Sequence, residues 1–259
     1  SVATARMSDE NKARFTREHQ DFILFDFDKY YAIDRYGSLT DAAQFERFCR
    51  YIDIPCKRVK EHPFFNYHRL EAVFETQEYT FDPILIAAYY RKKLRDAPGV
   101  EVWCHHQIEA AGAVGEEWEV EIRSLRTQEI KKVRAHQVIN ATYSASNAIN
   151  QLFGLEEINL MHEISEMAFV SSPQLKNIGL TVMDGPFGSI MPYGKSGLLS
   201  LSSVAYTHHK VSYAAQPTFD CQDLREDCSP DFTSICNACQ YRPTSNYEKM
   251  LAQMRQYLT

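Results

Sequence analysis

Two stretches of the chain place apolar residues at the spacing of an α-helix. In the first, Asp41 can cap the N-terminus and Pro55 marks the end. In the second, Pro83 stands at the first helical position, and Pro98 followed by glycine closes the pattern. The sequence therefore predicts one helix in each stretch. The apolar positions are Ala42, Phe45, Phe48, Cys49 and Ile52 in the first and Leu85, Ile86, Tyr89 and Tyr90 in the second.

Alternating apolar and polar positions predict strands through the middle of the chain. Residues 117–122, EWEVEI, alternate strictly and follow a glycine-containing turn. A helix, a strand, a hairpin and an apolar strand form an α/β unit with an antiparallel insertion, and the later strands predict an antiparallel sheet. Weaker patterns predict helices over residues 8–19 and 245–258. The other strand patterns occupy residues 100–104, 132–139, 166–171, 179–183, 187–191 and 198–206.

Composition indicates a globular chain with a full core, since it has 259 residues of which 44% are hydrophobic. The net charge is −6 without a run of five like charges, so nucleic acid and membranes are not expected as partners. The longest apolar runs fall far short of the roughly 20 residues that span a bilayer. The first residues are polar and the seven cysteines are most simply reduced thiols, so we expect a cytoplasmic location.

Three segments carry a family resemblance. Residues 79–103 join a helix introduced by Asp-Pro to a Gly-Val-Glu-Val strand, and residues 136–147 contain a strand that ends in Asn-Ala-Thr. Residues 178–207 contain short strands separated by Gly-Pro turns. In this order the segments resemble the D-amino-acid-oxidase-like flavoproteins. The resemblance implies a flavin domain and a substrate domain, with the chain crossing between them more than once.

The resemblance also implies a mixed α/β (α+β) fold in four segments. The implied function is that of an FAD-dependent oxidoreductase acting on a small-molecule substrate, either an amine or an amino-acid-like compound. The four segments are a substrate-side helical segment (residues 1–75), a partial flavin-domain α/β unit with a β-meander (76–150), an antiparallel sheet of the substrate-domain type (151–215) and a cysteine-bearing tail with a C-terminal helix (216–259).

The implied FAD site is incomplete in this sequence. None of the ten glycines forms the GxGxxG fingerprint that brings backbone close to the pyrophosphate at a helix N-terminus. We therefore expect a missing N-terminal dinucleotide-binding segment as a partner. The resemblance places a flavin-facing turn at Asn140, Ala141, Thr142 and Tyr143, where Tyr143 replaces the family's common glycine and would crowd a flavin. A buried strand with a polar end is the alternative interpretation of this segment.

Candidate substrate-binding residues follow from the chemistry of a carboxylate. Such a substrate needs a guanidinium clamp, because arginine pairs bidentately with two oxygens. Arg35 and Arg69 each stand beside aromatic residues, and Tyr193 and Lys195 lie in a turn between two predicted strands. The alternatives are solvent-exposed arginines and a turn with a structural role alone. Flavin chemistry requires few catalytic side chains, and none is assigned.

Three other interpretations stay open. Residues 23–28, ILFDFD, resemble the first motif of haloacid-dehalogenase-type phosphatases, in which Asp26 would attack phosphorus and Asp28 would handle the leaving-group proton. The chain could instead be a non-catalytic domain that keeps the sheet for ligand or partner binding. We predict no metal in the substrate site, but four cysteines of the tail could form a zinc site, a redox pair or unremarkable thiols. These are Cys221, Cys228, Cys236 and Cys239.

Overall fold

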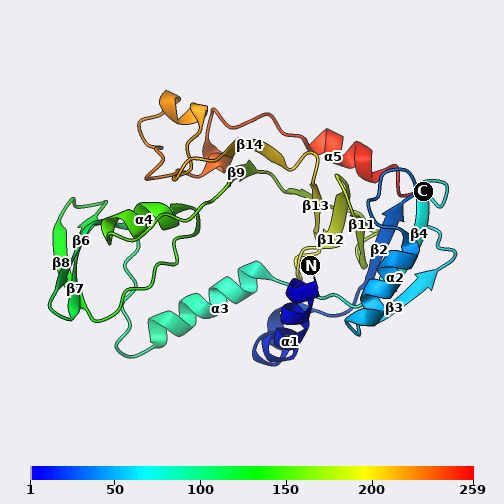
Figure 1. Cartoon of the computed structure of the whole chain (residues 1–259), viewed down its shortest axis with the longest axis horizontal. Coiled ribbons are helices and arrows are strands. Elements are labelled where there is room, and N and C mark those ends of the chain that lie inside the picture. The colour runs from blue at the N-terminus through cyan, green and yellow to red at the C-terminus, as the bar shows by residue number, and fades with distance from the viewer. Residues whose placement is uncertain (1) are drawn as a thin grey trace. The chain divides into compact units, whose positions relative to one another are not determined.

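The computed structural model describes residues 2–259 and contains two compact units (Figure 1). Unit 1 consists of Ser1–Asp96, Glu166–His208 and Ser245–Thr259, and unit 2 consists of Ala97–Ser165 and His209–Thr244. The chain therefore leaves unit 1 and returns to it twice. Helices occur together with mostly antiparallel sheets, so the predicted mixed α/β class is confirmed.

A seven-stranded sheet forms the centre of unit 1. Its strand order is β10-β13-β12-β11-β2-β4-β3. The two central strands, β2 and β11, run parallel, and every other neighbouring pair runs antiparallel. The bounds are Asp28–Asp34 for β2, Cys56–Val59 for β3, Leu70–Thr76 for β4, Ala168–Val170 for β10, Ile178–Met183 for β11, Gly188–Pro192 for β12 and Leu199–Ser203 for β13.

Each face of this sheet carries its own hydrophobic cluster. Helix α5 (Tyr247–Met254) packs Met250 and Met254 against one face, where Leu180 of β11 is also fully buried. Helix α2 (Ala42–Tyr51) packs on the opposite face, where the rings of Phe45 and Phe74 lie 5.0 Å apart. Since successive strand residues point to opposite faces, alternate residues of β2 contribute to the two clusters.

The helices predicted from capping signals are confirmed. Asp41 and Gln44 form a reciprocal capping box at the start of α2. The Asp82 carboxylate accepts hydrogen bonds from the backbone N–H groups of Ile84 and Leu85, both at 3.0 Å, and so caps α3 (Pro83–Asp96). The remaining elements of unit 1 are α1 (Val2–His19), the 3-10 turn η1 (Gln20–Phe22) and the antiparallel pair of β1 (Ile23–Leu24) and β5 (Thr80–Phe81).

Unit 2 is built around a three-stranded meander. The ring of Trp118, on the middle strand, contacts that of Phe153 at 5.0 Å, just after helix α4. The two-stranded ribbon of β9 and β14 belongs to unit 2 except for His208. The bounds are His106–Val114 for β6, Glu117–Ser124 for β7, Ile130–Ala135 for β8, Ser146–Leu152 for α4, His162–Ser165 for β9 and His208–Ser212 for β14, with 3-10 turns η2 (Tyr143–Ala145), η3 (Asp220–Leu224) and η4 (Cys236–Ala238).

The structure corrects three predictions. Residues 1–75 contain strands β1 to β4 besides helices, because β2 is buried on both faces and so lacks the alternation that marks a strand. Residues 100–104 form no strand, and Val102 is 59% exposed. The strand predicted over residues 132–139 ends at Ala135, and Ile139 is 87% exposed. In the last two cases, no strand among residues 2–259 pairs with the apolar segment.

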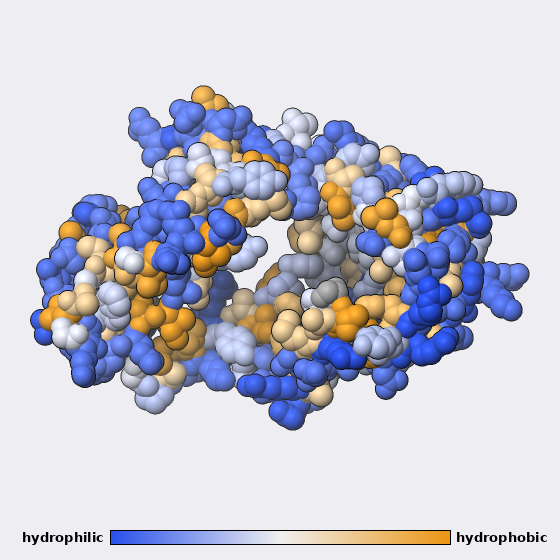
Figure 2. All heavy atoms as spheres, viewed as in Figure 1, coloured by the Kyte–Doolittle hydropathy of each residue, from blue (hydrophilic) through white to orange (hydrophobic). Residues whose placement is uncertain are grey.

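Hydrophilic residues cover much of the face shown in Figure 2, with hydrophobic residues in small groups between them. Helix α3 contributes several partly exposed apolar side chains, among them Ile84 at 65% exposure. Within residues 2–259, no helix combines the length and the apolar character that crossing a membrane requires.

Candidate functional site

A buried lysine on the central strand β2 is the centre of the candidate site. The Lys29 side chain is 1% exposed, and its Nζ lies 3.1 Å from Oε2 of Glu78. Nζ also donates a 2.6 Å hydrogen bond to the Thr181 hydroxyl of the neighbouring strand β11. The Thr181 hydroxyl is in turn 2.9 Å from that of Ser189 on β12. A charged and polar network therefore crosses three adjacent strands on one face of the sheet.

The strand registers explain why these side chains meet. Lys29 and Tyr31 are two residues apart on β2 and so point to the same face, and Nζ lies 4.3 Å from the centre of the Tyr31 ring. Opposite Lys29 on the parallel strand is Gly179. A Cβ atom at Gly179 would lie 2.8 Å from Sδ of Met191, which itself contacts Nζ at 3.0 Å. The glycine therefore leaves the space that Met191 fills beside the lysine.

Electrostatics of the network follow from its burial. Desolvation lowers the pKa of Lys29, and the nearby Glu78 carboxylate opposes that shift. Burial also raises the pKa of the Tyr31 hydroxyl, which donates a 3.0 Å hydrogen bond to the same Glu78 oxygen. One carboxylate oxygen of Glu78 therefore neutralises the buried Lys29 ammonium and also accepts a hydrogen bond from the neutral Tyr31 hydroxyl.

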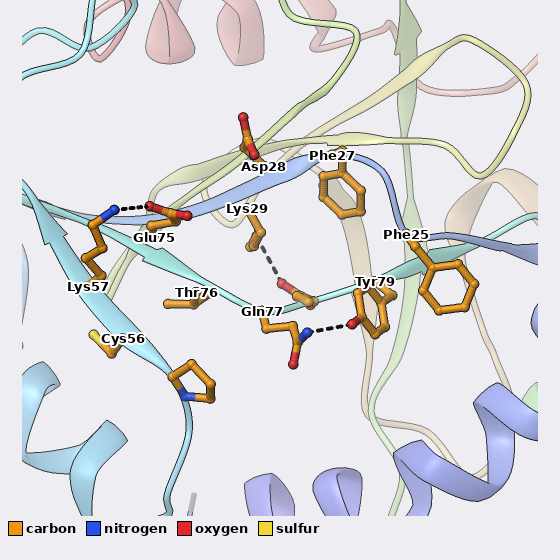
Figure 3. Close-up of a pocket in the computed structure, with 12 residues that line it drawn as sticks. Phe25, Phe27, Asp28, Lys29, Cys56, Lys57, Glu75, Thr76, Gln77 and Tyr79 are labelled. Atoms are coloured by element: carbon orange, nitrogen blue, oxygen red, sulfur yellow. Dashed lines mark hydrogen bonds and ion pairs between the residues drawn. The ribbon is translucent and has the colours of Figure 1, made fainter.

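Two adjoining cavities meet at this network. The first, of about 520 Å³, is lined by Lys29 and by residues 75–79 (Figure 3). In Figure 3 Lys29 extends toward the segment that carries Gln77, whose amide donates to the Tyr79 hydroxyl. The second cavity, of about 710 Å³, lies among α1, α2 and β2, and residues 76–79 also line it. Glu78 thus stands in the wall that the two cavities share.

The two predicted arginines are engaged within the protein. Nη2 of Arg35 donates to the backbone carbonyls of Tyr67 at 3.1 Å and Leu70 at 2.9 Å. Nε of Arg69 lies 2.5 Å from Oδ2 of the fully buried Asp34. Neither arginine lines the two cavities. Their role in substrate binding stays a prediction.

Tyr193 and Lys195 lie in the turn between β12 and β13. The Tyr193 ring contacts that of Phe169 at 4.5 Å. Nζ of Lys195 donates to the Asp21 carbonyl at 2.7 Å, and its backbone N–H donates to Oδ2 of Asp82 at 3.0 Å. These contacts fix the turn against the start of α3, and ligand binding by either residue stays a prediction.

The turn predicted to face a flavin lies in unit 2. Oδ1 of Asn140 accepts from the backbone N–H and the hydroxyl of Thr142 at 3.2 and 2.7 Å, so the side chain closes its own turn around Ala141. Tyr143 has φ +57° and is 92% exposed. The backbone of Tyr143 therefore adopts the left-handed conformation that glycine enters without strain. Within residues 2–259 no glycine-rich turn opens a helix in the dinucleotide pattern, so these residues do not by themselves fit FAD.

The other candidate chemistries involve separate residues. Asp26 lies outside the strands and is exposed, whereas Asp28 begins β2 and lines the 520 Å³ cavity. In the tail, Cys239 accepts a hydrogen bond from the Tyr241 backbone at 3.3 Å, and a hydrogen bond from Arg225 lowers the pKa of this thiol. In the part of the chain that the structure describes, no group of three or more His, Cys, Asp or Glu side chains is placed to hold a metal ion.

Sequence reasoning missed the Lys29, Tyr31 and Glu78 network. The available signal was the lysine itself, which stands in an aromatic segment and shares its strand face with Tyr31 and Ile33. Lysine is almost never fully buried unless it is paired, so a lysine in such a segment indicates an acidic partner. The identity of that partner depended on the tertiary fold.

Comparisons with known proteins show similarity in fold. No protein-family model and no curated protein sequence matches the chain. The crystal structure of L-proline dehydrogenase from P. horikoshii matches 100% of this chain with a TM-score of 0.60 at 13% identity. This chain covers 65% of the length of that dehydrogenase. A p-nitrophenol 4-monooxygenase from Pseudomonas putida matches 73% of the chain with a TM-score of 0.43 at 15% identity, and 44% of the monooxygenase is covered.

Proposed function

We propose that this chain is the substrate-side part of a flavin-dependent oxidoreductase that acts on an amine or an amino-acid-like small molecule. The observation that carries the proposal is the likeness in fold to L-proline dehydrogenase over the whole chain. Helix α3 and strands β11, β12 and β13 agree with the resemblance to D-amino-acid-oxidase-like flavoproteins found in the sequence, whereas the strands expected at residues 100–104 and 136–139 do not form. The whole dehydrogenase is longer than this chain, so the activity is assigned to an assembly that contains the chain.

Unit 1 supplies the substrate side in this proposal. Its cavities of about 520 and 710 Å³ fall within the range of roughly 300–1,000 Å³ that is usual for small-molecule sites. Their shared wall holds Glu78, whose partner Lys29 lines only the 520 Å³ cavity, and the 710 Å³ cavity is otherwise largely apolar. A few polar groups in an apolar cavity are what orients a small substrate.

The proposed cofactor is FAD, which accepts hydride equivalents from an amine carbon when bound. Because residues 2–259 do not fit the dinucleotide by themselves, we assign the pyrophosphate site to a dinucleotide-binding segment that acts as a partner. The seven free cysteines agree with a cytoplasmic location, where thiols stay reduced.

Flavin absorbance spectra test the proposal. The chain is purified alone, with added FAD, and together with a dinucleotide-binding segment supplied as a separate chain. We expect oxidised-flavin absorbance only when that segment is present, and bleaching when amines or amino acids are added without oxygen. Stoichiometric FAD on the chain alone contradicts the divided site. A flavin that no amine or amino acid reduces contradicts the oxidoreductase and favours the alternative of a non-catalytic ligand-binding domain.

A matched pair of variants connects the activity to the cavity wall. Lys29→Met removes the buried ammonium, whereas Lys92→Met removes a lysine of α3 that lines neither cavity and has a side chain 76% exposed. We expect Lys29→Met to slow reduction of the flavin by substrate about tenfold or more, because a substrate that the cavity wall holds out of position reacts more slowly. Lys92→Met is expected to leave the rate unchanged.

A further inference from the structure

The 710 Å³ cavity of unit 1 is a partly open, largely apolar chamber with several aromatic side chains in its lining and helix α1 as its roof. Phe15 of α1, Phe45 and Phe48 of α2 and Tyr31 of β2 line it. The roof helix α1 is held at several points along its length. Lys12 donates a 2.9 Å hydrogen bond to Gln77, and the rings of Phe15 and Phe81 lie 5.7 Å apart. The chamber is therefore part of the fold of unit 1.

The carboxylate of Glu78 opens into this largely apolar chamber. The Glu78 side chain is 44% exposed and lines the cavity, whereas Lys29, its partner, is 1% exposed and does not. Lys29 and Tyr31 both contact Oε2 of Glu78. Since the hydrogen bond and the ion pair of Glu78 both use Oε2, Oε1 keeps acceptor capacity for a molecule in the chamber.

The other polar groups of the lining also suit a cation. Asp9 adds a second carboxylate, and the one basic residue, Lys12, is engaged with Gln77 and lies 5.0 Å from the centre of the Tyr79 ring. The surrounding aromatic faces attract an ammonium group. The hydroxyl oxygens of Thr76 and Thr80, in the same wall, are buried without a partner in the described part of the chain, and each can accept a hydrogen bond.

A clamp for a carboxylate is not part of the lining. No arginine lines the chamber, and Arg35 and Arg69 are committed to backbone carbonyls and to Asp34. From these contacts we infer that the 710 Å³ cavity binds an aromatic or apolar amine without a carboxylate, with its ammonium at Oε1 of Glu78. The inference names the substrate class of the proposed oxidoreductase and rests on that function for turnover, but the binding itself requires no flavin.

Calorimetric titration of the 259-residue chain with three matched probes tests the inference. The probes are 2-phenylethylamine, the neutral 2-phenylethanol and phenylalanine, which adds a carboxylate to the amine. We expect 2-phenylethylamine to bind at least about tenfold more tightly than either of the others, the size of one hydrogen bond to a charged group. Equal or tighter binding of the alcohol or the amino acid, or no binding of the amine, overturns the inference.

Two variants and a control locate the binding. Glu78→Gln is expected to weaken amine binding about tenfold or more. Glu75→Gln, which removes a carboxylate that lines only the 520 Å³ cavity, is expected to leave it unchanged. Ala5→Trp fills the chamber from α1 without touching the Lys29 network, and it serves if Glu78→Gln does not fold. Amine binding that survives Ala5→Trp in the folded protein contradicts the assigned cavity.

The outcome is separate from that of the flavin experiment. Amine binding is measured on the chain without flavin, whereas the proposed function is measured by flavin binding and reduction. A chain that binds 2-phenylethylamine in this cavity, within an assembly that holds no flavin, refutes the oxidoreductase and leaves the amine site in place. An assembly whose flavin is reduced only by amino acids refutes the amine class and leaves the oxidoreductase in place.

Discussion

Asp82 accepts a 3.0 Å hydrogen bond at Oδ2 from the backbone N–H of Lys195, which lies 113 residues further along the chain. The other carboxylate oxygen of Asp82 caps helix α3. One buried carboxylate, 5% exposed, therefore joins the start of a helix to the turn between β12 and β13. It connects two segments of unit 1 that are separated in sequence by the whole meander.

Asp82→Ala is expected to destabilise unit 1 by about 2–3 kcal/mol, because it removes a helix cap and leaves the Lys195 N–H without its acceptor. Asp41→Ala is the control, since Asp41 is exposed and only caps α2; we expect a loss of about 1 kcal/mol. Urea unfolding measures both. Equal losses for the two variants would show that the Lys195 contact contributes nothing.

Gly194→Ala is expected to disrupt the same junction. Gly194 has φ +53°, and a Cβ atom there would lie 2.4 Å from the Asp82 Cα, so the backbone must shift. Gly197→Ala is the matched control, because Gly197 has φ +77° with open space around it. The left-handed conformation alone costs about 1–2 kcal/mol, so both variants are expected to lose stability. We expect thermal unfolding to show a clearly larger loss of stability for Gly194→Ala than for Gly197→Ala. Similar losses would contradict the close approach.

Tyr143→Gly is expected to stabilise unit 2. Tyr143 has φ +57° and a side chain that is 92% exposed, so glycine relieves the left-handed conformation while little contact is lost. The greater freedom of glycine in the unfolded chain offsets part of the gain, which leaves up to about 1 kcal/mol. Tyr143→Ala keeps the strain and is the control. Thermal unfolding that ranks alanine at or above glycine contradicts this account.

Local signals in the sequence predicted the helices whose first turns are capped by a nearby side chain. Asp41 and Asp82 begin helices because their carboxylates cap backbone groups two and three residues away, and that information lies within a few positions. The strand pattern at residues 100–104 was equally clear, yet no strand forms there. A strand requires a partner for its backbone groups, and alternation alone does not supply one.

The candidate site was harder to predict, because its contacts join distant positions. Lys29 bonds to Thr181, 152 residues away, and this contact depends on β2 pairing in parallel with β11. Parallel pairing of two strands that belong to an otherwise antiparallel sheet leaves no short-range signal. The arginines, by contrast, were chosen for their chemistry, and the structure shows both engaged in internal contacts.

Lys29→Met and Glu78→Gln are expected to differ in their effect on stability. Lys29→Met removes the buried charge of the ammonium, and Glu78, whose side chain is 44% exposed, stays solvated without its partner, so we expect the free energy of unfolding to change by less than about 1 kcal/mol. Glu78→Gln leaves that ammonium buried without its counter-charge, and we expect a loss of about 2 kcal/mol. Urea unfolding of both variants checks the order, and the double variant should recover most of the loss. A larger loss of stability for Lys29→Met than for Glu78→Gln contradicts the expected order.

The pKa of Lys29 also predicts a pH dependence. Burial lowers this pKa below its ordinary 10.5 in the folded chain. Between the lowered folded-state pKa and 10.5, the unfolded chain binds more protons at this lysine than the folded chain does, so the free energy of unfolding rises with pH in that window. The burial penalty is present in full below the window and disappears as the folded lysine loses its proton.

Urea unfolding of the wild type and of Lys29→Met from about pH 8 to about pH 10 measures this effect. We expect the wild-type value minus the Lys29→Met value to increase with pH, because only the wild type carries the buried ammonium. Tyr31, whose pKa burial raises, acts with the opposite sign as pH passes its ordinary value of 10.0. It is present in both proteins and largely cancels in the difference. A difference that stays flat across this range would mean that the Glu78 carboxylate fully compensates the burial of Lys29.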